Sequence, residues 1–69
     1  MTETTTTGER GESITTIRDG SKVATIHETG ERFFVAMHID HGPDGRTFCD
    51  SATYKTMRGA QRRARAFFA

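Results

Sequence analysis

The sequence predicts a small α+β domain, in which an antiparallel β-meander of three to four strands packs on one C-terminal α-helix. Two dipeptides with turn character, Asp19-Gly20 and Thr29-Gly30, separate runs rich in β-branched residues. Apolar and polar side chains alternate within those runs, and residues 57–68 have helical spacing instead. A chain of 69 residues has room for one domain, which we place at residues 13–69.

The first segment, residues 1–12, has no apolar side chain after Met1. Such a segment buries too little surface to offset the entropy lost on ordering, so we expect a disordered tail. The alternative is that its run of four threonines extends an edge strand, because threonine favours β-structure.

Ordered structure is expected to begin near Ser13. The expected strands are residues 13–18, 21–28, 31–40 and a short fourth strand, 46–51, whose pairing the sequence leaves open. Residues 41–45, HGPDG, contain two glycines and a proline and therefore form a loop.

The two turns also set the expected register of the strands. With the two dipeptides as loops, Ile17 pairs with Lys22, and Ile26 faces Phe33. Paired residues share a sheet face, and faces alternate along each strand. One face then collects an apolar core: Ile17, Ala24, Ile26, Phe33, Val35, Met37 and Ile39. The other face is mixed and mostly polar: Ile14, Thr16, Arg18, Val23, Thr25, His27, Phe34, Ala36, His38 and Asp40.

The C-terminal helix is expected to cover the core face. Thr56 is a suitable N-cap, and Gly59 allows a close approach to the sheet. The apolar positions of this helix, which we place over Phe33, Val35 and Met37, are Met57, Ala60, Ala64 and Phe67. The opposite stripe carries Arg58, Arg62 and Arg65.

Charge is divided along the chain. Residues 55–69 carry five basic side chains and no acid, whereas residues 1–54 carry five basic and nine acidic ones, a net charge of −4. The single cysteine, Cys49, allows no internal disulfide, which favours a reducing compartment. No apolar run approaches the length of a membrane span, and we expect a cytoplasmic protein that does not enter the membrane.

No constellation of residues indicates catalysis, a cofactor or a metal site. His27, His38, His41 and Cys49 carry suitable donor atoms. The expected register, however, places the first two histidines about 20 Å apart. Cys49 is expected opposite Met37 on the core face, as a buried structural thiol, and we predict that the chain is not an enzyme.

The mixed sheet face favours a protein-binding function. Phe34 stands there, and the 41–45 loop pairs His38 with Phe48, which places two aromatic rings in polar surroundings. With the arginine stripe, the candidate partner-binding residues are Phe34, His38, Phe48, Arg58, Arg62 and Arg65. A protein partner is expected, and the low apolar content is also compatible with a homodimer.

Two resemblances bear on the kind of partner. The run FCDSATYKTMRGAQRRARAFF, within residues 32–68, resembles in layout the plant ethylene-response-factor domain and the arm-binding domain of some phage integrases. This implies, as an alternative, that the sheet or helix binds double-stranded DNA. Those domains carry several Arg and Trp residues on the exposed sheet face. This chain has no Trp, and we expect only Arg18 and Arg46 on that face, beside Asp40.

The second resemblance concerns the general type of protein. In its small size, its charge division and its lack of catalytic motifs, the chain is similar to accessory proteins of phages and mobile elements, such as anti-CRISPR proteins. Those inhibitors bind a large host-defence complex and block its nucleic-acid or nuclease-recruitment site. The expected function is therefore a small non-catalytic protein-binding module that acts as such an inhibitor.

Overall fold

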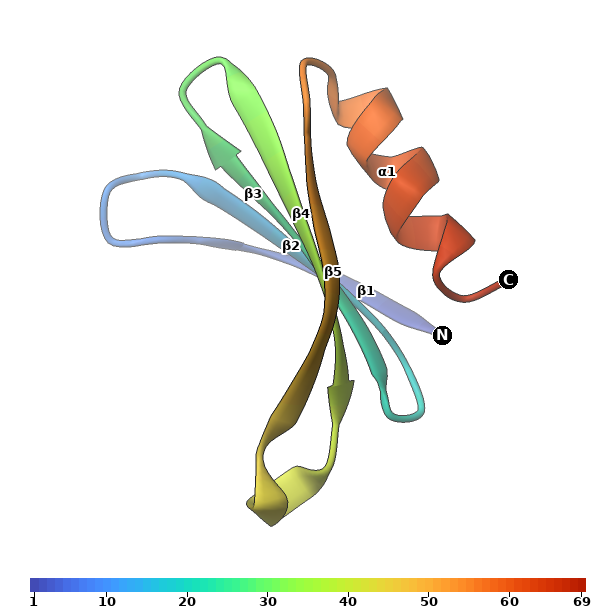
Figure 1. The fold of residues 1–69 in the computed structure, drawn as a ribbon. Coiled ribbons are helices and arrows are strands. Elements are labelled where there is room, and N and C mark those ends of the chain that lie inside the picture. Colours follow the sequence, from blue (N-terminus) through green and yellow to red (C-terminus); the bar gives the residue numbers. More distant parts are fainter.

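The computed structural model describes all 69 residues and has two layers, a five-stranded antiparallel sheet and one helix (Figure 1). The strands follow one another across the sheet in chain order: β1 (Thr2–Thr7), β2 (Ser13–Asp19), β3 (Lys22–Thr29), β4 (Arg32–Asp40) and β5 (Arg46–Tyr54). A short 3-10 turn, Gly42–Asp44, joins β4 to β5, and helix α1 (Met57–Ala66) follows. The predicted α+β meander with a C-terminal helix is confirmed, but the sheet has five strands instead of three to four.

The additional strand is β1, so the prediction of a disordered tail over residues 1–12 is wrong. β1 pairs with β2 along its whole length, from Thr2 opposite Arg18 to Thr7 opposite Ser13. The connection is a tight turn, in which Gly8 N–H donates to the Glu12 carbonyl at 2.7 Å. Gly11, with φ 82°, supplies the left-handed residue that a short hairpin loop needs. Backbone pairing orders this segment without any apolar burial.

The two predicted hairpins exist, but each loop lies one residue further along the chain than predicted. Asp19 pairs with Lys22, and Thr29 pairs with Arg32, so Gly20 and Gly30 are the first loop residues. Both glycines have φ near 60°, while the residue after each has negative φ, which is the pattern of type II′ turns. Each strand partner therefore shifts by two residues. A shift of two leaves every side chain on its predicted face.

The predicted core face is the one that α1 covers. Its fully buried cluster joins five strand residues to two from the helix: Ile17, Ala24, Ile26, Val35, Met37, Ala60 and Ala64. Phe33, Met57 and Phe67 are half-buried against this cluster, whereas Phe34 lies on the opposite face and is 39% exposed. The division of the two adjacent phenylalanines between the faces is therefore confirmed.

Helix α1 has the predicted N-cap, Thr56, whose hydroxyl accepts a hydrogen bond from the Gly59 N–H at 3.1 Å. It ends at Ala66, two residues before the predicted end, and Phe67 is its C-cap. A Cβ at Gly59 would lie 3.2 Å from a ring carbon of Tyr54. The glycine thus permits the close approach to the sheet that the sequence suggested.

Strand β5 pairs with β4 and is three residues longer than predicted, as far as Tyr54 opposite Phe33. The predicted pair His38–Phe48 is present, but a bulge follows it, so that Met37 faces Asp50. Cys49 is the extra residue of the bulge and is exposed. The prediction of a buried Cys49 opposite Met37 is therefore wrong. The bulge instead turns Asp50 toward the helix layer, where its carboxylate meets Arg63 at 2.7 Å.

Candidate partner-binding face

The sheet face turned away from α1 has no second layer upon it, and we call it the open face. Figure 1 shows α1 on one side of the twisted sheet only. The pairing places these residues on the open face, seven of them hydroxyl-bearing, in rows that cross all five strands: Thr2, Thr4, Thr6, Ile14, Thr16, Arg18, Val23, Thr25, His27, Arg32, Phe34, Ala36, His38, Asp40, Arg46, Phe48, Ser51 and Thr53. The face is thus a broad, weakly polar surface with a few aromatic and charged groups.

Phe34 lies in a shallow hollow at one end of the open face. The hollow has a volume of about 530 Å³, and the other residues that line it are His27, Thr29, Arg32 and Thr53. Phe34 is its one large apolar side chain. An exposed aromatic ring surrounded by polar side chains is typical of a residue that contributes strongly to protein association.

Phe48 forms a second aromatic group at the other end of the open face. It is 60% exposed, and its ring meets the His38 ring edge-on, with centroids 5.7 Å apart. Val23, which pairs with His38, is fully buried although it lies on this face. The His38 and Phe48 side chains thus form a packed step, which spans β4 and β5 and leaves much of the Phe48 ring exposed.

A small ion network lies beside this step. Asp40 accepts a hydrogen bond from Arg18 at 3.0 Å, and Arg46 approaches the same carboxylate at 3.9 Å. The backbone N–H of Gly42 and the Arg18 guanidinium hold the pKa of Asp40 below its ordinary value of 3.8. The carboxylate is therefore ionised at neutral pH and offsets part of the charge of two arginines on the open face.

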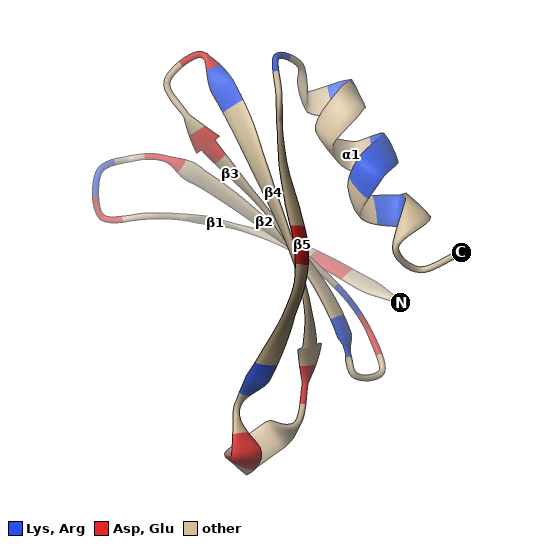
Figure 2. Cartoon of the chain, viewed as in Figure 1, with Lys and Arg blue, Asp and Glu red and all other residues tan.

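The helix arginines lie in the other layer, where Figure 2 marks the lysine and arginine positions along the α1 ribbon in blue. Arg65 pairs with Glu3 of β1 at 3.5 Å, whereas Arg58 and Arg62 are exposed and form no ion pair. Arg63, which the sequence did not single out, hydrogen-bonds to Asp50 and lowers the pKa of that carboxyl. The structure therefore brings Phe34, His38 and Phe48 onto one face but does not join them to Arg58, Arg62 and Arg65.

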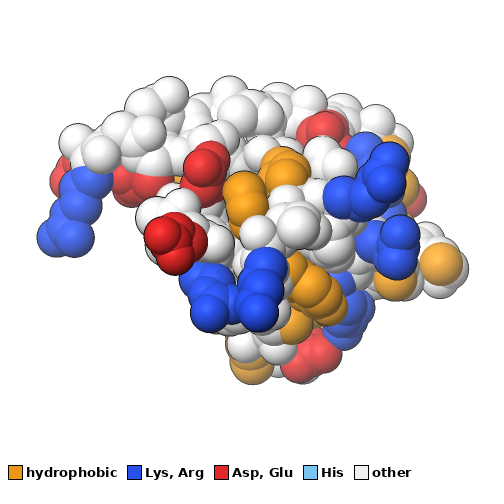
Figure 3. Space-filling view, turned by 90° about the horizontal axis from the view of Figure 1, so that it is seen from above, with side chains coloured by type: hydrophobic (Ala, Val, Ile, Leu, Met, Phe, Trp, Pro, Cys, Tyr) orange, Lys and Arg blue, Asp and Glu red, His pale blue; other side chains and the backbone are white.

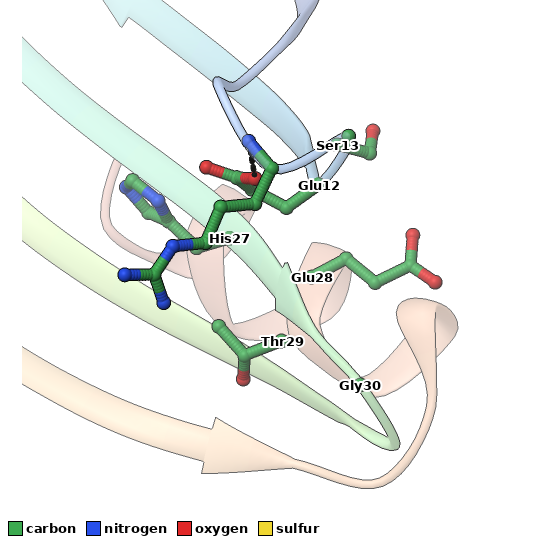
Figure 4. A pocket seen from close by; sticks show the side chains of 8 residues that line it. Glu12, Ser13, His27, Glu28, Thr29 and Gly30 are labelled. Carbon is green, nitrogen blue, oxygen red and sulfur yellow. Dashed lines mark hydrogen bonds between the residues drawn. The ribbon is translucent and has the colours of Figure 1, made fainter.

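A separate cleft of about 660 Å³ opens between the β1–β2 turn and the β3–β4 turn (Figure 4). Its walls come from residues 10–13 and 27–30, among them His27, Glu12 and Glu28, and include no hydrophobic side chain. Across the whole chain, no three His, Cys, Asp or Glu side chains lie close enough together to hold a metal ion. This cleft is lined by polar groups and lacks an apolar anchor for a ligand.

Sequence reasoning missed the part of the open face that β1 supplies. Thr2, Thr4 and Thr6 widen the face by one strand. The available signal was the pattern Gly8-Glu-Arg-Gly11, which fits a three-residue hairpin loop with glycine in its left-handed position.

Comparison with known protein families, characterised proteins and solved structures finds no significant match to this chain. The one helix is too short and too polar to cross a lipid bilayer. The fold and its open face define a class, a two-layer α+β domain with one uncovered sheet surface.

Proposed function

We propose that this chain is a small non-catalytic protein-binding module, and that its partner docks on the open face. The observation that supports this most strongly is the exposure of Phe34 and Phe48, 39% and 60%, on a sheet face without a covering layer. Association that buries two such rings gains the hydrophobic free energy that the isolated chain leaves unused. Thr25, Ser51 and Thr53, which lie near them on the same face, supply hydroxyl groups for the polar contacts of an interface.

The finer proposal is that binding inhibits the partner. A domain of 69 residues without a catalytic constellation acts by occupying a surface of a larger molecule. The similarity in size and charge division to phage and mobile-element inhibitors, anti-CRISPR proteins among them, supports this choice. The exposed Arg58 and Arg62 in the other layer then contact the partner only if it also reaches around the edge of the sheet.

Binding of double-stranded DNA is the second candidate, and one observation favours it. The open face carries Arg18, Arg32 and Arg46 against a single carboxylate, Asp40. Although the strand region as a whole is acidic, this face is therefore net positive. Against this candidate, Asp40 already engages two of the three arginines. A salt titration with duplex DNA separates the candidates, because phosphate contacts weaken steeply as salt rises.

The protein-binding proposal predicts which surface a partner needs. The tagged chain is used to capture partners from a cell lysate, and the affinity of the captured protein for purified variants is then measured. Phe34→Asp combined with Phe48→Asp is expected to weaken binding by about 30-fold or more, as loss of a hot spot of ~2 kcal/mol does.

The matched control changes two exposed residues of the other layer, Arg58→Glu with Arg62→Glu. It is expected to change the affinity by less than about threefold, in the range of a neutral rim contact. Far-UV circular dichroism checks that both double variants are folded. If the arginine variant loses binding and the aromatic variant keeps it, the site lies on the helix layer and the proposal is wrong.

A further inference from the structure

Strand β1 forms one edge of the sheet, and its outer side has no hydrogen-bonding partner. All six of its residues are exposed. In an edge strand, half of the backbone N–H and C=O groups point outward and are available to another strand. In Figure 3, one margin of the molecule is largely white, with few charged side chains, and the residues of β1 are likewise polar and uncharged except Glu3.

Proteins commonly protect such edges with charges, proline, bulges or a covering element. β1 has one charged residue, Glu3, no proline, and an unbroken register with β2. The opposite edge, β5, is protected by the bulge at Cys49, by its charged residues Arg46 and Asp50, and by α1 packing beside it. The two edges therefore differ, and β1 is the one open to strand addition.

The helix leaves room for an added strand next to β1. α1 packs on β3, β4 and β5, and the Arg65 side chain, through its ion pair with Glu3, is what reaches β1. A new strand beside β1 would therefore lie on the side of β1 away from the strands on which α1 packs.

From these features we infer that β1 pairs antiparallel with β1 of a second copy of this chain, forming a continuous ten-stranded sheet. The occupant is a second copy because β1 is complementary to itself. Five of its six residues are threonine, so a two-fold axis sets threonine against threonine, a favourable cross-strand pair. The partner needs no different sequence.

The single charge selects the register. With Thr5 opposite its own copy, Glu3 faces Thr7 of the other chain, and the two Glu3 carboxylates lie about 14 Å apart along the strands. A register centred on Thr4 halves that distance to about 7 Å. The Thr5-centred pairing therefore keeps the like charges apart, and each Glu3 retains its own Arg65.

This dimer extends the open face and does not cover it. Thr5 and Thr7 lie on the helix side of β1, while Thr4 lies on the open face. Two open faces would then be joined side by side across the two-fold axis. The inference stands independently of the proposed partner, and variants at Thr5 and Thr7 leave the aromatic groups untouched.

The test is the mass of the full chain in solution, measured by sedimentation equilibrium at concentrations up to about 1 mM, together with two charge variants. The wild type is expected to approach twice the 7.7 kDa of one chain as its concentration rises. Thr5→Lys places two ammonium groups opposite each other on the axis, so we expect dimerisation at least tenfold weaker. Thr7→Lys adds the same charge to the same strand opposite Glu3 of the other copy, so we expect the dimer to persist.

A covalent readout keeps the inference testable if Thr5→Lys disturbs β1, since Thr5 also contacts the Thr15 hydroxyl at 3.3 Å. In a Cys49→Ser background, Thr5→Cys is expected to form an intermolecular disulfide on mild oxidation, because directly opposed residues lie within its reach. Thr7→Cys is expected to form none, because its two copies lie about 14 Å apart. A wild type that stays monomeric up to about 1 mM, or variants at Thr5 and Thr7 that behave alike, would overturn the inference.

Discussion

Val35→Asp is expected to prevent the chain from folding. Val35 is fully buried at the centre of the sheet, between Ile26 on β3 and Ala52 on β5. An ionised carboxylate without a partner costs several kcal/mol in such a position. A domain of 69 residues has a total stability of about 3–10 kcal/mol. The variant should therefore lack the far-UV circular dichroism and the cooperative urea transition of the wild type.

The neighbouring residue provides the control. Phe34→Asp introduces the same carboxylate one position earlier in β4, where the side chain lies on the open face. Its stability is expected to change by less than about 1 kcal/mol, as for most exposed positions. If the two variants were equally folded, or if only Phe34→Asp unfolded, the assignment of the two sheet faces would be wrong.

Met37→Ala is expected to lower the free energy of unfolding by about 3 kcal/mol. Met37 is fully buried between the sheet and α1, in the cluster with Ala60 and Ala64. Deleting most of a buried side chain removes its transfer free energy and leaves a cavity, with a usual cost of about 2–5 kcal/mol. Urea denaturation at constant m-value measures the change.

Met57→Ala is the comparison for this variant. Met57 is only half-buried, at the first position of α1, where neighbouring groups and water can fill the space. Met57→Ala should therefore lower the free energy of unfolding clearly less than Met37→Ala does. A loss below about 1 kcal/mol at Met37, or the reverse order of the two variants, would contradict the packing of α1 on β4.

The face of each central-strand residue was predictable because it depends on parity alone. Both hairpin loops lie one residue away from the predicted position, yet Ile26 and Val35 remain inside and Phe34 outside. Moving a loop by one residue shifts the partners by two, which preserves the alternation of faces. The helix was equally predictable, because its apolar spacing and the Thr56 cap indicate the same helical segment.

Strand β1 could not be predicted from the hydrophobic pattern. Its residues bury no apolar side chain, and the backbone hydrogen bonds to β2 order it. The bulge at Cys49 was equally hidden, as was the contact that it allows between Asp50 and Arg63 across the two layers. Contacts of this kind arise only when the elements have been placed in space.

The candidate site was also predictable only in part. Phe34, His38 and Phe48 follow from alternation and the predicted pairing, and they do lie on one face. The arginine stripe was identified from helical spacing, but spacing does not show which cations have partners. Arg65 is paired with Glu3, while Arg58 and Arg62 remain exposed.

The most direct measurement of the central claim is hydroxyl-radical footprinting of the chain, free and bound to its captured partner. Phe34 and Phe48 are exposed and should react in the free chain, whereas binding should protect both rings. Met57 and Phe67, at the helix layer, should keep the reactivity that they have in the free chain. If binding protects the helix residues and leaves Phe34 and Phe48 reactive, the partner does not dock on the open face.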